Sequence, residues 1–259
     1  MIPARGFIAG FRTLFRSFEL LKQPGVRLYV VIPLLVNAVL FAVTLAYAFH
    51  QVTELREFIA AQFSQQWAWL DWFLWILWPL FILISLLLVY FTFAIVANLV
   101  AAPFNGFLSA AIERHLTGQL PEDGSNWKTI PRELGRAFKA EIIKFGYFAV
   151  RGIPLLLLFV IPVVNAVAPV IWFFFAAWML ALEYMDFPMG NRGYTFPEER
   201  RLLAGQRATM MGFGSATLLL TMIPVVNFIA MPVAVAGATR LWVEQQHRIE
   251  TGQPPDVAA

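Results

Sequence analysis

The sequence predicts an all-α integral membrane protein, and composition is the first reason. Hydrophobic residues make up 59% of the 259 residues and charged residues only 14%. In a soluble domain about a quarter of the residues are charged. Two long uncharged segments, and two further hydrophobic segments interrupted by proline, are the other reasons. One membrane domain over residues 1–259 accounts for the length of the chain.

The first pattern, in residues 5–22, predicts an amphipathic helix and not a cleaved signal peptide. Charged residues continue through the segment in place of an apolar run and a small-residue cleavage site. Phenylalanine and leucine recur at helical spacing, while Arg5, Arg12 and Arg16 fall on the opposite side. Such a helix lies on the membrane surface or packs on the protein's own core, and the two arrangements are compatible.

Two segments are predicted to cross the bilayer completely. Residues 28–49 are uncharged and apolar. About 20 helical residues at about 1.5 Å each cross a hydrocarbon core roughly 30 Å thick. The second span is predicted over residues 72–98, after a tryptophan-rich stretch that is typical of a membrane interface.

The two later hydrophobic segments share an internal repeat, Ile-Pro-Val-Val-Asn followed by a further proline. Its residues are Pro162, Asn165 and Pro169 in the first segment and Pro224, Asn227 and Pro232 in the second. Proline removes a backbone donor and clashes with the preceding turn, so two prolines this close predict a broken helix. Protein or a wet cavity must cover the polar backbone of such a break, and repeated broken segments are typical of transport sites.

Two topologies are compatible with the breaks: kinked helices that cross, or re-entrant helical hairpins that return on the side they entered. With hairpins over residues 152–185 and 212–239, 18 of the 19 Lys and Arg residues lie on one side of the membrane. With four full spans, 14 lie on one side and 5 on the other. The positive-inside rule favours the hairpins, with residues 103–151 and 186–211 forming a layer of amphipathic cytoplasmic helices.

No pattern of catalytic or metal-binding residues is present in the sequence. It contains no His-Glu-x-x-His zinc motif, no phosphate-binding glycine loop, no nucleophile elbow and no cysteine. Basic residues are spread through loops that flank the membrane, which is not the pattern of nucleic-acid binding. The sequence therefore predicts neither an enzyme nor a metalloprotein, and it implies no cofactor.

One segment has the features of an anion-binding site. After Lys22, a Pro-Gly turn leads into the first span through Gly25, Val26, Arg27 and Leu28. The free amides of a helix N-terminus and the fork of an arginine favour a tetraoxyanion. A site made only of donors favours sulfate over hydrogen phosphate, because hydrogen phosphate must itself donate a hydrogen bond. The alternative is a hinge with an ordinary arginine anchor at the membrane edge.

Three stretches resemble the CysZ-type sulfate permease family. They are Pro-Gly-Val-Arg at 24–27, Ala-Pro-Phe-Asn at 102–105 leading to Glu113, and Leu-Glu-Tyr-Met-Asp-Phe-Pro-Met at 182–189 followed by Asn-Arg-Gly at 191–193. The similarity in order and spacing covers nearly the whole chain. It implies a multi-pass, homo-oligomeric permease of the bacterial inner membrane that supplies sulfate for cysteine synthesis.

The resemblance also implies that the turn at 24–27 corresponds to the sulfate-binding turn of the family. Leu28 stands where relatives can carry a second arginine, so that binding here would be weaker or would depend more on backbone amides. Sulfite and selenate are the related anions that such a site would accept. A non-transporting membrane scaffold of oligomeric helical type, in which the repeats only pack helices, is the alternative function.

Charged residues in the same stretches have two interpretations. Glu183 and Asp186 are three residues apart and close in sequence to Arg192, which favours structural pairing with basic groups across the helical layer. Gating of an anion path by Glu113 and Arg114, or by Glu183, is the alternative. The sequence leaves both open.

Overall fold

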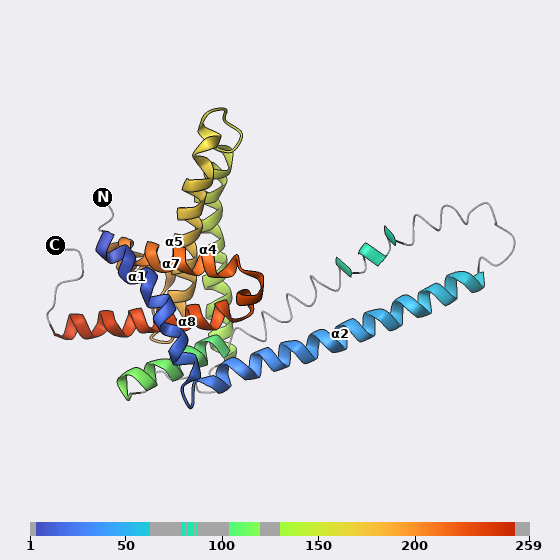
Figure 1. Ribbon diagram of the computed structural model, residues 1–259, viewed down its shortest axis with the longest axis horizontal. Coiled ribbons are helices and arrows are strands. Elements are labelled where there is room, and N and C mark those ends of the chain that lie inside the picture. Colours follow the sequence, from blue (N-terminus) through green and yellow to red (C-terminus); the bar gives the residue numbers. More distant parts are fainter. Residues whose placement is uncertain are drawn as a thin grey trace. The chain divides into compact units, whose positions relative to one another are not determined.

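The computed structural model describes residues 4–62, 104–119 and 130–251, together with 79–80, 82–84 and 86–87. The regular structure of these residues is helical, which confirms the predicted all-α class (Figure 1). The chain divides into two compact units, one of residues 1–30 with 105–259 and the other of residues 31–104.

The described residues of the second unit lie mainly in the long helix α2, Arg27–Gln62, from Val31 onward. Its first part, Arg27–Gln51, has the length and composition to cross a membrane. The side chains of Val39 and Phe49 are 62% and 76% exposed, as expected for a helix surrounded by lipid. The predicted first span therefore lies in α2, whereas the predicted second span, 72–98, lies outside the described residues except for a few helical positions.

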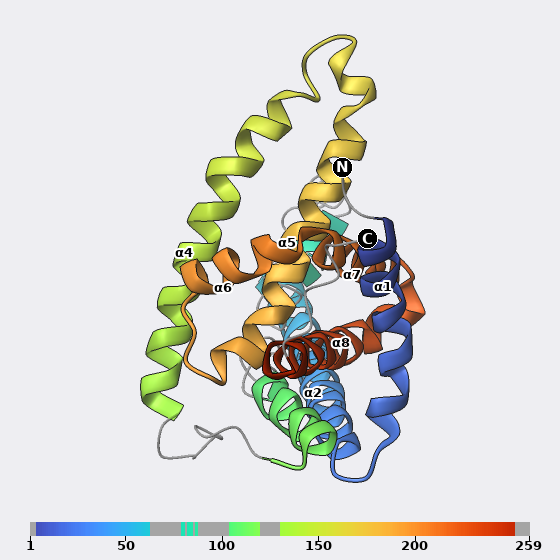
Figure 2. The same ribbon diagram turned by 90° about the vertical axis from the view of Figure 1, so that its left-hand side faces the viewer.

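Two helical hairpins dominate the first unit (Figure 2). Their helices are α4 (Ile130–Leu157), α5 (Ala168–Gly190), α7 (Arg207–Thr221) and α8 (Pro224–Glu250). The arms of the first hairpin are antiparallel, since Tyr147 contacts Trp178 near the base and Phe159 contacts Trp172 near the tip. Both turns fall at the repeated Ile-Pro-Val-Val-Asn sequences, and Asn227 lies in the first turn of α8.

The prolines of the repeat act differently from one another. Pro162 lies in the turn before the 3-10 helix η4 (Val164–Ala166), beside Val163, whose φ of 71° is rare for a β-branched residue. Pro224 begins α8, where its missing amide costs no helical hydrogen bond. The further proline of the repeat, Pro232, lies inside α8, where the surrounding core packing outweighs the lost hydrogen bond.

Glycines allow α7 to lie very close to α1 (Ala4–Arg16) and to α5. A Cβ added at Gly212 would overlap the carbonyl oxygen of Phe7 in α1. A Cβ added at Gly214 would overlap the carbonyl oxygen of Ala177 in α5 in the same way. These backbone contacts explain why α7 carries a Gly-x-Gly sequence between two neighbouring helices.

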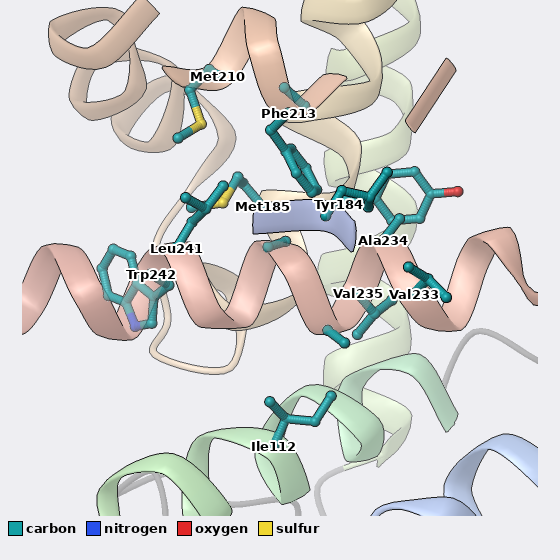
Figure 3. Close-up of a cluster of buried hydrophobic side chains, with 14 of the residues drawn as sticks. Ile112, Tyr184, Met185, Met210, Phe213, Val233, Ala234, Val235, Leu241 and Trp242 are labelled. Atoms are coloured by element: carbon teal, nitrogen blue, oxygen red, sulfur yellow. The ribbon is translucent and has the colours of Figure 1, made fainter. Parts of the chain in front are cut away.

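The core of the first unit lies where α5, α7 and α8 meet. Met185, Phe213 and Trp242 come from these three helices and are fully buried (Figure 3). Ile112, from the helix over residues 104–117, is buried on the other side of α8 (Figure 3). This packing fixes the helix ends that carry the charged residues of the candidate site.

The helix α1 is amphipathic, as the sequence predicts. Leu14 is buried in the core of the first unit, whereas Arg5, Arg12 and Arg16 are exposed. Phe15 is 47% exposed, within a row of phenylalanine rings along the helix. The helix thus packs on the protein's own core, and contact of its remaining apolar side chains with a membrane surface stays a prediction.

Candidate functional site

The corner before α2 is built on a glycine. The 3-10 helix η1 (Ser17–Lys22) ends just before it, and Gly25 has a φ of 88°, which favours glycine. Val26 is 1% exposed and anchors the corner in the core. Arg27 and Leu28 begin α2, and both side chains are exposed. The corner is therefore anchored by the buried Val26, while its charged side chain, Arg27, is exposed.

Three amides of this corner already have partners within the chain. Val26 and Arg27 donate to the carbonyl oxygen of Gln23 at 3.1 and 3.2 Å, and Tyr29 donates to that of Val26 at 3.0 Å. Within the part of the chain that the structure describes, no ion pair engages Arg27. An anion at this corner would therefore interact chiefly with the Arg27 guanidinium and with the positive end of the helix dipole.

A buried carboxylate lies on the helix over residues 104–117. Glu113 is 1% exposed, and its Oε1 accepts hydrogen bonds from Nε of Arg192 at 3.0 Å and from Nη2 of the same side chain. Asn191 donates to a backbone carbonyl of the same helix at 2.9 Å. These contacts fasten the turn after α5 to this helix, and Arg114 beside the pair is exposed.

Lys144 of α4 holds a second group of charges together. Its nearly buried ammonium contacts Glu141 at 2.7 Å, Glu183 at 3.3 Å and Asp186 at 2.5 Å. Burial disfavours the ammonium charge, but the carboxylates of Asp186 and Glu183 outweigh burial and hold the pKa of Lys144 above its ordinary value. The lysine thereby ties α4 to α5.

A fourth carboxyl adjoins this group without touching the lysine. Glu199 lies on α6 (Phe196–Leu203) and is 0% exposed. Among the described residues no hydrogen-bond donor reaches either of its carboxyl oxygens. Burial, and next the adjacent Asp186 carboxyl, raise the pKa of Glu199 to about 9. This carboxyl is therefore uncharged near neutral pH.

Four of the charged residues singled out from the sequence fall into two groups, and the exposed Arg114 belongs to neither. Glu183 and Asp186 share Lys144, while Arg192, although close to them in sequence, pairs with Glu113. Neither group includes a residue of the corner at 25–28. The geometry of both groups suits cross-linking of helices, and a gating role stays a proposal.

Lys144 and Glu199 are not among the candidate residues predicted from the sequence. Lys144 stands three residues after Glu141, a spacing that predicts a helical ion pair but not the two partners on α5. Glu199 follows Pro197 and Glu198, so it resembles an ordinary acidic residue in the first turn of a helix. Neither pattern in the sequence reveals that the side chain is buried.

The residues at the hairpin turns lie at the surface of the first unit. Their neighbours are apolar and exposed, with Val160 at 79% and Met222 at 68%. Exposed apolar tips of this kind suit contact with lipid. The exposed residues of the repeat at these turns are Pro162, Asn165, Pro224 and Asn227.

Comparison with known proteins shows the family to which the chain belongs. Residues 13–232 match the family described as "Sulfate transporter CysZ/Etoposide-induced protein 2.4". The chain belongs to this family. The match includes the corner at 25–28, both charged groups and both hairpin turns. Family membership confirms the resemblance found in the sequence, and it agrees with the prediction that the chain is not an enzyme.

A protein from Pectobacterium atrosepticum is similar to this chain in sequence. That protein is named "Sulfate transporter CysZ" and is 39% identical over 248 residues, which cover 95% of this chain and 88% of the relative. Among the described residues of this CysZ-family chain, three helical segments have the length and composition to cross a membrane. They are Arg27–Gln51, Ala168–Gly190 and Val226–Glu250.

Proposed function

We propose that this protein is a sulfate permease or channel of a bacterial inner membrane, importing sulfate for assimilation into cysteine. The observation that carries the proposal is 39% identity, over 95% of the chain, to a protein named as a sulfate transporter. Three apolar helical segments and exposed apolar hairpin turns suit a protein embedded in lipid. The permease works as a homo-oligomer in this proposal.

In the same proposal the corner at 25–28 binds sulfate, and sulfite and selenate are its close analogues. A divalent oxyanion gives up much hydration on binding, so charge and donors must converge at one place. The exposed Arg27 guanidinium at the first residue of α2 supplies such a place. The occupied amides of Val26 and Arg27 make the side chain of Arg27 the main contributor.

Reconstituted flux tests the function directly. Liposomes that contain only this protein should take up radiolabelled sulfate, and unlabelled selenate or sulfite should compete better than phosphate. The physical reason is that sulfate accepts hydrogen bonds from every side, whereas hydrogen phosphate needs an acceptor at the site. Flux no greater than in empty liposomes would favour the scaffold function. Equal competition by phosphate would contradict a site made only of donors.

We also propose that both hairpins are re-entrant. The helix α7 has 15 residues and is about 22 Å long, shorter than a hydrocarbon core of roughly 30 Å. From Arg151 to Val160, at the tip of the first hairpin, a helical chain covers only about 15 Å. Re-entrant hairpins would also leave 18 of the 19 Lys and Arg residues on one side, a bias that the positive-inside rule favours over the 14 and 5 of four full spans.

Cysteine labelling tests this topology on a chain without native cysteine. Gln119→Cys and Gly205→Cys, at exposed positions, should react with a membrane-impermeant reagent from the same side. Val160→Cys should react from neither side, because a re-entrant tip ends inside the bilayer. Reaction of Val160→Cys from the opposite side would mean that the hairpin crosses completely. Opposite sides for Gln119→Cys and Gly205→Cys would overturn the hairpin topology.

A further inference from the structure

Glu199 is the most enclosed carboxyl of the charged group shared by α4, α5 and α6. The side chains of Glu141, Glu183 and Asp186 are 59%, 45% and 25% exposed, so water reaches each of them. Glu199 is 0% exposed. An ionised carboxylate that no water reaches needs strong hydrogen-bond donors from the protein, because burying an unpaired charge is very costly.

The cation that acts on Glu199 is Lys144, and it has no donor left for Glu199. A lysine ammonium carries three N–H donors. In Lys144 these three meet the carboxylates of Glu141, Glu183 and Asp186. Within residues 4–62, 104–119 and 130–251, no other donor reaches the carboxyl oxygens of Glu199.

Arg151 of α4 and Arg200 of α6 lie over the ring of Tyr147. The guanidinium carbons of Arg151 and Arg200 lie 3.9 and 5.1 Å from the centre of the Tyr147 ring. The group that lies within hydrogen-bonding range of Glu199 is the Asp186 carboxyl. Two ionised carboxylates would repel each other and could not form a hydrogen bond, whereas an acid and a carboxylate form a strong one.

We propose that Glu199 is a proton-binding site, whose protonated carboxyl donates a hydrogen bond to the Asp186 carboxylate and so links α6 to α5. Asp186 is at the same time the ion-pair partner of the Lys144 ammonium, at 2.5 Å. The groups that act on Glu199 from the helices packed against α6 are Lys144 on α4, and Glu183 and Asp186 on α5. The ligand of this site is a single proton and not a metal cation.

The electrostatics of the site agree with this geometry. Burial first, and the Asp186 charge second, raise the pKa of Glu199 to about 9, while Lys144 opposes the rise. Glu198, the preceding residue of α6, is exposed and accepts from the Thr195 hydroxyl at 2.6 Å and from the Thr195 amide at 2.8 Å, and these two contacts lower its pKa. Two adjacent glutamates of one short helix therefore hold opposite protonation states near neutral pH.

The bound proton makes the stability of the fold depend on pH. The pKa of Glu199 in the folded chain lies above that of an unfolded glutamate, about 4.3. Its stabilising contribution is therefore fully present below pH ~4.3 and is lost as the pH rises to about 9. Between these values one extra proton binds the folded state, so each pH unit changes the unfolding equilibrium constant by about tenfold.

Thermal unfolding of the full chain in detergent, from pH 6 to pH 9, tests the proposal. Wild type should lose stability steadily across this range. Glu199→Gln donates a hydrogen bond without titrating. Its unfolding equilibrium constant should therefore rise about tenfold less per pH unit than that of wild type, which makes it the more stable protein at pH 9. The matched control is Glu198→Gln, which should keep the pH dependence of wild type.

Infrared difference spectroscopy decides the protonation state even if Glu199→Gln fails to fold. Wild type at neutral pH should show the C=O stretch of a protonated buried carboxyl, which disappears on titration above pH ~9 and persists in Glu198→Gln. Absence of this band in wild type, or equal pH slopes for wild type and Glu199→Gln, would overturn the proposal. Stabilisation of wild type at pH 9 by added sodium or calcium would overturn it too, since the site would then hold a metal cation.

Discussion

Arg27→Ala should reduce sulfate binding and flux by ~10–100-fold while leaving a folded, membrane-inserted protein. Loss of one charge-assisted hydrogen-bonding contact costs about 1.5–3 kcal/mol. The side chain is exposed and has no ion-pair partner among the described residues, so its removal leaves no buried charge behind. The corner itself is held by Val26, which is 1% exposed, and by the Gln23 carbonyl. Sulfate binding and liposome flux measure the effect.

Two variants show whether geometry or charge is responsible. Arg27→Lys keeps the charge but loses the planar fork, so it should recover only part of the binding. Arg132→Ala removes one positive charge from the predicted cytoplasmic layer and should change sulfate binding little, because scattered surface charges are screened. An Arg27→Ala protein with undiminished flux would mean that the corner is a hinge and that sulfate binds elsewhere, with the hairpin turns at Asn165 and Asn227 as the next candidates.

The sequence predicts the helices and their breaks because these depend on local chemistry. Composition and uninterrupted apolar length predict α2, and the repeated Ile-Pro-Val-Val-Asn sequence predicts the two hairpin turns. Pro224 stands at the start of α8, where proline is well tolerated. Pro232 does not break α8, because the packing of α8 in the core is a property of the folded unit and not of its local sequence.

The charged groups could be predicted only in part, because their partners come from distant segments. The spacing of Glu183 and Asp186 indicates that both face one side of a helix. Nothing in the sequence places Lys144, 39 residues before Glu183, against that side. The burial of Glu199 depends in the same way on how α6 packs against α4 and α5. Burial and long-range contacts decide the protonation state of a carboxyl, so the raised pKa of Glu199 follows only from the folded structure.

Lys144→Met should destabilise the protein by about 3 kcal/mol near neutral pH. Breaking a buried ion pair by removing one partner costs ~3–5 kcal/mol, because the remaining charge is left uncompensated. The lower end applies here, since Glu183 and Asp186 are 45% and 25% exposed and water screens them. Methionine fills a similar volume, so the loss reports the charge and not a cavity. Thermal unfolding of both proteins in the same detergent measures it.

Acidification and a second substitution separate this electrostatic effect from general damage. Without the lysine, Glu183 and Asp186 repel each other, so the stability lost in Lys144→Met should be partly recovered as the pH falls and these carboxylates bind protons. Asp186→Asn added to Lys144→Met should recover part of it at neutral pH, since it removes one of the two charges. Lys22→Met, which removes an exposed lysine, should change stability by no more than about 0.5 kcal/mol. If Lys144→Met were as stable as Lys22→Met, then α4 and α5 would be held together by apolar packing alone, and the three carboxylates around Lys144 would be solvated without it.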